Sequence, residues 1–514
     1  MPRICIALGF PNAERLLDHA RREVEAGETF LEFRLDHLGC PERGIEVIPA
    51  LLREFPDCFV LATCRRHQNH GRFNGSIEEQ IRILDAAVSA GARAVDVEIE
   101  TAEMAPARLD VFRGRAMIVL SYHNFEGTPA LETVLRRMSA IPADAYKIVT
   151  TARKPSDNYR VLSLGRQHPK QSLILLAMGE IGFPSRVLST VFGGVYTYAA
   201  PQSAAGTAAG QVCARQLRQL YRIEKLARTA KVYAVIADPV QHSISPAVHN
   251  RAFQARRMDA VYLPCLVHPP HLKDFMGFAE KLPVSGFSVT IPHKQKITRY
   301  LDVIDPLARR IGAVNTVWKK AGKWRGTNTD AAGVRVPLER HLRLAKSSIL
   351  VVGNGGAARS AAFSLVDAGA RLSIVGRNPD RARALAKACG AEPLLREQAE
   401  AGHFDALVHA TPLGMSPNVN ECFFPNGIPA DVVLDMVYNP VETLLLRRAR
   451  EQGRTVVHGT EMFLEQAARQ FEIWTGENAP RTVMEKAALE ALAAHAESTN
   501  GQCESRSRAC PPSP

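Results

Sequence analysis

Two hydrophobic patterns alternate along the first half of the chain. Short runs of aliphatic and β-branched residues are typical of buried strands, and the segments between them carry apolar residues at helical spacing. In the segment 77–90, for example, Ile77, Ile81, Leu84 and Val88 fall on one helical face. The strand-like runs are 4–8, 30–36, 59–65, 94–100, 116–123, 145–151, 172–179 and 193–200. Eight strand–helix repeats predict an α/β fold that begins with a closed (β/α)8 TIM barrel, over residues 1–226.

A second α/β pattern begins at Val232, after a short linker at 227–231. In its middle, the buried-strand run 348–352 leads into the glycine-rich turn 353–359 and then into a helical segment, 360–368. A strand, a glycine turn and a helix in this order predict a Rossmann unit, in which backbone N–H groups and the helix N-terminus hold a pyrophosphate. The expected cofactor-binding residues of the turn are Gly353, Asn354, Gly355, Gly356 and Ala357.

The residues after the next strand select the cofactor. The strand 371–375 is followed by Gly376, Arg377 and Asn378, with no acidic residue to bind the ribose hydroxyl of NAD. An arginine suits an additional 2′-phosphate. We therefore expect NADP, with Arg377 and Asn378 at the phosphate.

Composition and charge exclude several functional classes. The 46% of hydrophobic residues suit packed cores, and no apolar run approaches the roughly 20 residues that cross a membrane. We expect neither a metal site nor disulfides, because the ten cysteines form no Cys-x-x-Cys motif. We also expect no secretory leader. The formal charge of +12 is dispersed, which favours small anionic ligands over nucleic acid. These observations predict a cytoplasmic enzyme that acts on small molecules, and they leave its oligomeric state open.

Polar residues gather at the carboxyl ends of the predicted barrel strands, where active sites of this fold lie. Glu32, Arg34 and Asp36 end the second strand, and Arg65, His123, Lys147 and Arg186 end or follow later ones. Burial and nearby cations favour the neutral amine of Lys147, which can form a Schiff base with a ketone. His123 on the neighbouring strand can then move a proton, and the arginines can bind a carboxylate.

These motifs resemble type I 3-dehydroquinate dehydratases. The resemblance rests on Glu32-Phe33-Arg34-Leu35-Asp36, Ala62-Thr63-Cys64-Arg65, Ser121-Tyr122-His123, Tyr146-Lys147-Ile148 and Ser185-Arg186, within about residues 1–221. It implies that Lys147 carries the imine and that His123 is the general acid/base. It also implies substrate-binding roles for Glu32, Arg34, Arg65, Arg186, Thr207 and Gln211. Where family members commonly have a glutamate that supports the histidine, this chain has Asn69, next to His70.

Hydroxyl and amide residues recur in the second half, together with one lysine and one aspartate. Lys294 follows Thr290-Ile291-Pro292-His293, and Asp330 follows Thr327-Asn328-Thr329, a pair able to move a proton during hydride transfer at a carbonyl. Residues 231–494 resemble shikimate dehydrogenases. The resemblance implies a catalytic dyad of Lys294 and Asp330. It implies substrate binding by Ser243, Ser245, Thr290, Asn315, Tyr438 and Gln466, and cofactor binding by Thr411, Met436 and Gly459 as well.

Together the halves imply a two-step enzyme: Schiff-base dehydration of 3-dehydroquinate to 3-dehydroshikimate, then reduction with NADPH to shikimate, a step toward aromatic amino acids. We expect a substrate-binding domain at 231–335, completed by 465–494, a Rossmann NADP-binding domain at 336–464, and a disordered tail at 498–514. Two alternatives are a dehydrogenase half that acts on quinate and a sensor of quinate-pathway compounds without catalysis. Retention of all four catalytic residues argues against the sensor.

Overall fold

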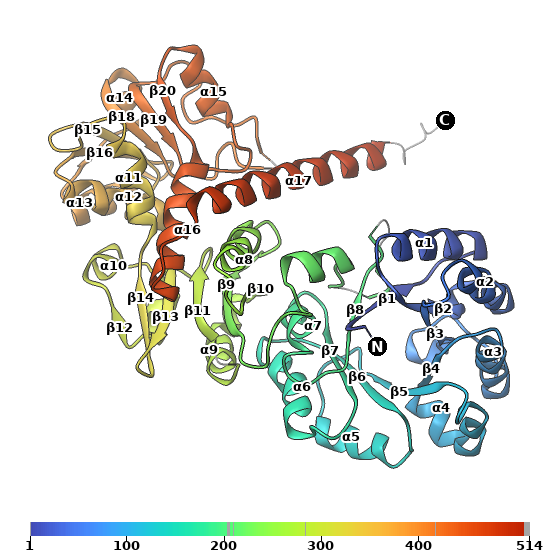
Figure 1. Cartoon of the computed structure of the whole chain (residues 1–514). Coiled ribbons are helices and arrows are strands. Elements are labelled where there is room, and N and C mark those ends of the chain that lie inside the picture. Colours follow the sequence, from blue (N-terminus) through green and yellow to red (C-terminus); the bar gives the residue numbers. More distant parts are fainter. Residues whose placement is uncertain (1, 203–205, 209, 283, 417, 508–514) are drawn as a thin grey trace. The chain divides into compact units, whose positions relative to one another are not determined.

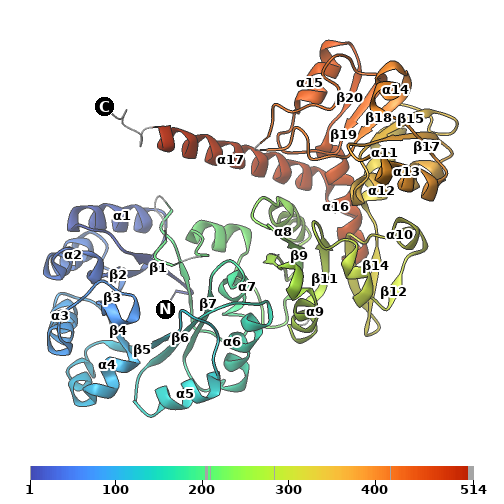
Figure 2. The ribbon, with the colours of Figure 1, turned by 180° about the vertical axis from the view of Figure 1, so that it is seen from behind.

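The computed structural model describes residues 2–202, 206–208, 210–282, 284–416 and 418–507 (Figures 1 and 2). By its internal contacts the chain divides into two compact units. The first comprises Met1–Lys231 and Asp259–Pro283, and the second comprises Val232–Met258 and Val284–Pro514.

Eight parallel strands form the sheet of the first unit, as the sequence predicts. They are β1 (Ile4–Leu8), β2 (Phe30–Arg34), β3 (Phe59–Thr63), β4 (Ala94–Glu98), β5 (Met117–His123), β6 (Ala145–Thr151), β7 (Leu173–Met178) and β8 (Thr197–Ala199). Their order is β7-β6-β5-β4-β3-β2-β1-β8, so neighbours in sequence are neighbours in space apart from the pairing of β1 with β8. The barrel is nearly closed: β7 and β8 are the ends of this order, and the amide of Val195, just before β8, donates to the carbonyl of Leu173 across the gap at 2.8 Å.

Helices follow most of the strands and lie outside them in Figure 1. They are α1 (Ala13–Glu25), α2 (Pro41–Glu54), α3 (Ile77–Ser89), α4 (Ile99–Met104), α5 (Leu131–Ser139), α6 (Ser156–Gln167) and α7 (Phe183–Leu188). Ser76 and Glu79 form a capping box that starts α3. The sequence predicts that the helix closing the barrel ends near Leu226, but the last helical segment before β9 is a π-helix at Gln216–Leu220, which ends six residues earlier. The first unit also holds β10 (Ala260–Leu266) and α9 (Leu272–Lys281).

The period of two along each strand decides which side chains face the barrel interior. Ala145 and Val149 of β6 belong to one interior cluster with Leu61, Ala94 and Val119 of the neighbouring strands. Lys147 lies between Ala145 and Val149 at the same parity, and so points inward. The same rule places the polar side chains of the other strands in one inner layer.

The second unit begins with a mixed sheet. Its strands β9 (Lys231–Ala237), β11 (Val284–Val289), β13 (Thr316–Lys320), β14 (Lys323–Thr327) and β12 (Val303–Ile304) are neighbours in that order. β9 and β11 are parallel, whereas β11, β13 and β14 pair antiparallel. Helices α8 (Ser245–Ala255), α10 (Pro306–Ile311), α11 (Asp330–Glu339) and α16 (Gly459–Thr475) belong to the same unit.

A parallel sheet forms the rest of this unit. Its order, β17-β16-β15-β18-β19-β20, reverses between β15 and β18, which is the switch point where doubly wound sheets bind ligands. Ile349 and Val351 of β15 enter one apolar cluster, and Leu350 and Val352 enter the other, so both faces are buried. The strands are β15 (Ser348–Val352), β16 (Arg371–Val375), β17 (Glu392–Pro393), β18 (Phe404–His409), β19 (Ala430–Asp435) and β20 (Thr455–Val457). The helices are α12 (Gly356–Asp367), α13 (Pro379–Cys389), α14 (Arg396–Ala401) and α15 (Leu444–Glu451).

The last helix is longer than the sequence analysis expects. α17 (Arg481–Ser507) continues past Ser498, where a disordered tail is expected, because an established helix gains one hydrogen bond for each residue added. Residues 508–514 of that expected tail lie outside the described part of the chain. Over the described residues, no helix has both the length and the apolar character that crossing a membrane requires.

Candidate active sites

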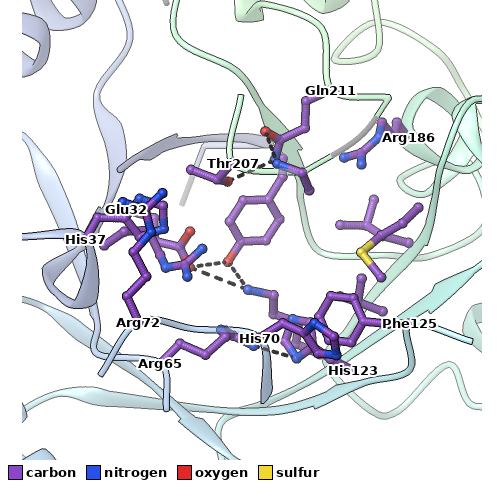
Figure 3. A pocket seen from close by; sticks show the side chains of 17 residues that line it. Glu32, His37, Arg65, His70, Arg72, His123, Phe125, Arg186, Thr207 and Gln211 are labelled. Atoms are coloured by element: carbon purple, nitrogen blue, oxygen red, sulfur yellow. Dashed lines mark hydrogen bonds and ion pairs between the residues drawn. The ribbon is translucent and has the colours of Figure 1, made fainter. Parts of the chain in front are cut away.

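All eight residues that the sequence predicts for the first site line one cavity of about 260 Å³ in the barrel (Figure 3). Glu32 and Arg34 come from β2, His123 from β5 and Lys147 from β6, while Arg65 directly follows the end of β3. Helix α7, which follows β7, adds Arg186, and the segment after β8 adds Thr207 and Gln211. The carboxyl ends of the strands therefore bring together side chains more than 170 positions apart in the sequence.

Lys147 is the buried centre of this cavity. Its Nζ donates to Asp96 Oδ2 at 2.8 Å and to the Tyr198 hydroxyl at 2.9 Å, and Glu32 Oε1 lies 3.5 Å away. The charged groups nearest the amine are therefore carboxylates, not the cations that the sequence argument places around it.

His123 is held by a cation rather than by a carboxylate. The Arg65 guanidinium nitrogen Nη1 lies 2.6 Å and 2.8 Å from the two ring nitrogens of His123, and the two side chains point toward each other in Figure 3. Burial, and then the charge of Arg65, lower the pKa of His123 well below its usual 6.5. His123 is therefore a neutral imidazole at neutral pH, ready to accept a proton.

Asp96 joins the lysine and the histidine. Its Oδ1 accepts from Arg65 Nη2 at 3.0 Å and from the Ser121 hydroxyl at 2.6 Å, while Oδ2 accepts from Lys147. Burial opposes its ionisation, but the charges of Lys147 and Arg65 outweigh burial and lower the pKa of Asp96 below its ordinary value. The result is a buried network in which one carboxylate faces two cations.

Two further predicted arginines, Arg34 and Arg186, are buried beside the cavity. Nε and Nη2 of Arg34 both donate to Asp36, at 2.9 and 2.8 Å, which fixes the orientation of the guanidinium. Burial lowers the pKa of Arg186 to about 10. Arg186 keeps its charge at neutral pH, at the opposite side of the view from Arg72 in Figure 3. A buried cation beside an open cavity suits a ligand carboxylate.

The loops at the mouth complete the cavity. Gln211 Nε2 donates to the Thr207 hydroxyl at 3.5 Å, and Gln211 Oε1 accepts the Ala208 amide at 3.2 Å, so the two predicted ligands support each other. Asn69 donates to Glu100 at 3.3 Å and does not line the cavity. Its neighbour His70 does, with its ring 3.9 Å from that of Phe125.

Sequence reasoning missed several residues of this site. Asp96 and Tyr198 are the most important of them, and His37, His70, Arg72 and Phe125 also line the cavity. A signal for Asp96 exists, because it is a charged residue flanked by Val95 and Val97 on a strand that is buried throughout. Its partners, by contrast, lie 31 and 51 positions away along the chain.

The second unit brings Lys294 and Asp330 together. Lys294 Nζ lies 2.6 Å from Asp330 Oδ2, and the two side chains are 19% and 5% exposed. Lys294 follows β11, and Asp330 is the first residue of α11. The lysine is therefore the more open end of the pair.

Asn315 is tied to the other oxygen of Asp330. Its Nδ2 donates to Asp330 Oδ1 at 2.7 Å and to the Thr329 hydroxyl at 3.0 Å, while its Oδ1 accepts from the Thr316 hydroxyl at 2.7 Å. The structure thus adds a positioning contact to the substrate-binding role that is predicted for Asn315.

The other predicted substrate ligands occupy separate elements of this unit. Ser243 accepts the Ser245 amide at 3.3 Å at the start of α8, and the Thr290 amide bonds to the Ile236 carbonyl at 3.1 Å after β11. Gln466 is buried on α16. Tyr438 packs its ring 5.0 Å from Phe463, and burial raises the pKa of its hydroxyl. No hydrogen bond or ion pair among the described residues links these five to the dyad.

The glycine turn after β15 fits a dinucleotide. Gly353 has φ +125°, and a Cβ there would lie 2.7 Å from the Ala410 carbonyl, so only glycine suits the position. A Cβ at Gly355 would meet nothing within 4 Å, and α12 starts at Gly356, with Ala357 in its first turn. The helix begins four residues earlier than predicted, which places its N-terminus directly at the turn.

The remaining predicted cofactor residues surround this turn. Arg377 is exposed directly after β16, and Asn354 Nδ2 donates to the Asn378 carbonyl at 3.3 Å. The Asn378 side chain accepts the Arg381 amide at 3.0 Å, so it caps α13. Thr411 and Met436 follow β18 and β19, and Gly459 starts α16. Small residues at the turn and an exposed cation after β16 fit NADP.

The comparisons with known proteins match both halves. Residues 4–228 match the family "Type I 3-dehydroquinase", and residues 235–317 match "Shikimate dehydrogenase substrate binding domain". Residues 337–412 match "Shikimate / quinate 5-dehydrogenase", and 459–489 match "Shikimate 5'-dehydrogenase C-terminal domain".

Individual relatives extend these matches. A chloroplastic bifunctional 3-dehydroquinate dehydratase/shikimate dehydrogenase of Arabidopsis thaliana is 33% identical over 503 residues, which is 93% of this chain and 83% of the relative. A shikimate dehydrogenase (NADP(+)) of Bacillus cereus strain G9842 is 41% identical over 48% of this chain and 93% of its own length. The solved shikimate 5-dehydrogenase of Thermus thermophilus, in complex with NADP(H) and shikimate, shares 34% identity over 51% of this chain and 99% of that chain, with a TM-score of 0.47. The chain belongs to the family of bifunctional 3-dehydroquinate dehydratase/shikimate dehydrogenases.

Proposed function

We propose that this chain carries out two consecutive reactions of the shikimate pathway. The barrel removes water from 3-dehydroquinate to give 3-dehydroshikimate, and the second unit reduces that product to shikimate with NADPH. The observation that carries the proposal is the cavity that a buried Lys147 lines together with a neutral His123, a glutamate and four arginines.

Lys147 acts first. After losing a proton, its Nζ adds to the ketone carbon of the substrate, and the departure of the carbonyl oxygen as water leaves an imine. Glu32, whose Oε1 lies 3.5 Å from Nζ, is placed to take the proton that the amine must lose, while Asp96, 2.8 Å from Nζ, stays ionised and orients the amine. The imine withdraws electrons and so acidifies the adjacent carbon.

His123 moves the next proton. The lowered pKa keeps the imidazole neutral, so it can remove a proton from the carbon next to the imine. The hydroxyl on the following carbon then leaves as water, taking up a proton, and a double bond forms. Hydrolysis of the imine consumes one water and restores Lys147, so the sequence releases one water in total.

The cations around the cavity hold the substrate during these steps. Arg186 keeps a buried charge, and Asp36 orients Arg34, so both present a guanidinium to the cavity. We assign Arg186 to the carboxylate, and Glu32, Thr207 and Gln211 to the hydroxyls, since these side chains offer matching donors and acceptors.

In the second unit Lys294 and Asp330 manage the proton. The glycine turn and Arg377 would hold NADPH, which would supply a hydride for the carbonyl carbon. Lys294, the more open member of the dyad, donates a proton to the carbonyl oxygen, and Asp330 holds Lys294 in place at 2.6 Å. Asn315 fixes the other carboxylate oxygen, so the dyad is preorganised before substrate binds.

Borohydride trapping tests the first reaction. Treating the enzyme with 3-dehydroquinate and borohydride should reduce the imine to a stable amine on Lys147, found by peptide mass spectrometry. Lys147→Met should abolish the adduct, while Lys170→Met, a change at an exposed lysine, should leave it intact. An adduct on another lysine would disprove the assignment.

The oxidoreductase half has its own test. Asp330→Asn should stop reduction of 3-dehydroshikimate while the dehydratase rate stays at the wild-type level. Comparing shikimate with quinate, each with NADP and NAD, addresses the alternative that the family name "Shikimate / quinate 5-dehydrogenase" raises. We expect shikimate with NADP to be preferred. A cytoplasmic location and the absence of nucleic-acid and membrane partners stay predictions from the sequence.

A further inference from the structure

A buried histidine–aspartate pair lies beneath the nucleotide turn, outside the residues assigned above. His409 ends β18 and is paired in register with Val352, the last residue of β15, and with Asp435, the last residue of β19. It therefore stands at the carboxyl ends of three adjacent strands, beside the switch point. The side chains of His409 and Asp435 are 2% and 0% exposed.

Both ring nitrogens of His409 make hydrogen bonds. Nδ1 lies 2.8 Å from Asp435 Oδ1, and Nε2 lies 2.5 Å from the hydroxyl of Thr411. Asp435 also accepts the Val437 amide at 3.0 Å and the Thr443 hydroxyl at 2.6 Å. An ionised carboxylate can only accept hydrogen bonds, so the contact between Asp435 and Nδ1 of His409 requires a hydrogen on Nδ1.

This arrangement determines in which direction the Thr411 hydroxyl donates its hydrogen bond. With the hydrogen on Nδ1, Nε2 is the acceptor atom of the ring, and it accepts a hydrogen bond from the Thr411 hydroxyl. The Thr411 oxygen takes the Leu413 amide at 3.3 Å and keeps acceptor capacity for one more donor. Thr411 lies against the glycine turn, because a Cβ built on Gly353 would sit 3.3 Å from Thr411 Cγ2.

We propose that His409 and Asp435 are positioning residues that hold the Thr411 hydroxyl as a hydrogen-bond acceptor toward a donor group of the bound nucleotide. The proposal deepens the proposed function and rests on it, since it takes the turn after β15 as the NADP site. It assigns a role to a histidine that neither proton-transfer step uses. The ligand group must be a donor, such as a hydroxyl or an amide N–H.

A double-mutant cycle tests the coupling, with NADPH affinity measured by fluorescence titration of the full chain. His409→Asn keeps a donor near Asp435 but is too short to reach Thr411, and Thr411→Val removes the hydroxyl. Each single change should weaken NADPH binding roughly fivefold, as expected for one net hydrogen bond. The double variant should also be about fivefold weaker, because both changes remove the same interaction. Thr411→Ser keeps the hydroxyl and should bind NADPH with wild-type affinity.

The chain offers a matched control for the histidine. His403 and Asp431 form a second pair between the same two segments, with Nε2 3.1 Å from Oδ2, but they lie away from the turn and are 61% and 53% exposed. His403→Asn should leave NADPH affinity unchanged. Dehydratase activity in the barrel, measured on each variant, reports whether the rest of the chain is intact.

The outcomes separate the two proposals. If the wild-type chain binds no NADPH, the proposed function fails. If it binds and His409→Asn matches wild type, or the double variant is about 25-fold weaker, as independent effects would multiply, the positioning role is overturned while the function stands. Should His409→Asn not fold, Asp435→Asn takes its place in the cycle, because it removes the charge that fixes the tautomer, and the same outcomes decide.

Discussion

The replacement of Asp96 by asparagine probes the barrel site most directly. Asp96 is fully buried, and it accepts hydrogen bonds from Lys147, Arg65 and Ser121 at 2.8, 3.0 and 2.6 Å. An asparagine oxygen can still accept from Arg65 and Ser121. Its amide nitrogen would then face Lys147 Nζ, so two donors would meet. The variant loses one charge-assisted bond and leaves a buried ammonium with Glu32 at 3.5 Å as its remaining carboxylate.

The size of the effect follows from these contacts. A hydrogen bond to a charged group contributes about 1.5–3 kcal/mol, and breaking a buried ion pair costs about 3–5 kcal/mol. Because Glu32 partly compensates, we expect the free energy of unfolding of the barrel to fall by about 3 kcal/mol. For a domain of this size, the melting temperature should drop by about 6–12 °C. Calorimetry at neutral pH measures it, and Asp110→Asn, in an exposed pair with Arg113, should change it by less than about 2 °C.

The pH dependence of this effect is also determined. The folded-state pKa of Asp96 is lowered, so its stabilisation is present above the unfolded pKa of about 4 and is lost as pH falls through the folded value. The difference in melting temperature between wild type and Asp96→Asn should be the same at about pH 5 and pH 8, and it should become smaller below about pH 4. A melting temperature within about 1 °C of wild type at neutral pH would refute the view that Asp96 holds the two cations.

Three further predictions address the other parts of the chain. His123→Ala should slow dehydration by at least about 10²-fold. In the wild-type enzyme, kcat/KM for dehydration should stay level as pH falls through 6.5, because the lowered pKa keeps the imidazole neutral. A wild-type kcat/KM that falls with a midpoint near 6.5 would contradict this. Arg377→Ala should raise the KM for NADPH and leave that for NADH nearly unchanged, with Arg383→Ala as the control; equal effects on both cofactors would indicate a structural role. Fragments cut near Thr229 should each keep their activity, although the first loses Asp274, which accepts the Ser156 amide and hydroxyl at 2.8 and 2.7 Å. An inactive first fragment would show that the barrel needs residues 259–283.

The sequence by itself determined the secondary structure and most of the site residues. The alternation along each barrel strand places Lys147 inward between Ala145 and Val149, and the glycine turn after β15 is visible without any tertiary information. These features are readable because they depend on spacing within one strand or one turn. All eight barrel residues named from the motifs consequently line one cavity.

Only the tertiary structure decided which of these residues touch. Asp96 comes within 3.0 Å of Arg65 and Lys147, and Arg65 within 2.8 Å of His123, because β3, β4, β5 and β6 are paired in one order and register. These contacts reverse the expectation about Lys147, whose nearest charged groups are carboxylates.

The second unit shows the same limit. The structure shows that Asn378, a predicted cofactor residue, also caps the start of α13. His409 reaches Asp435 only because β18 and β19 pair in parallel. The spacing of residues along one chain constrains φ and ψ locally. Contacts between distant residues, and the charge environment that sets each pKa, follow from how the strands are paired and what they bury.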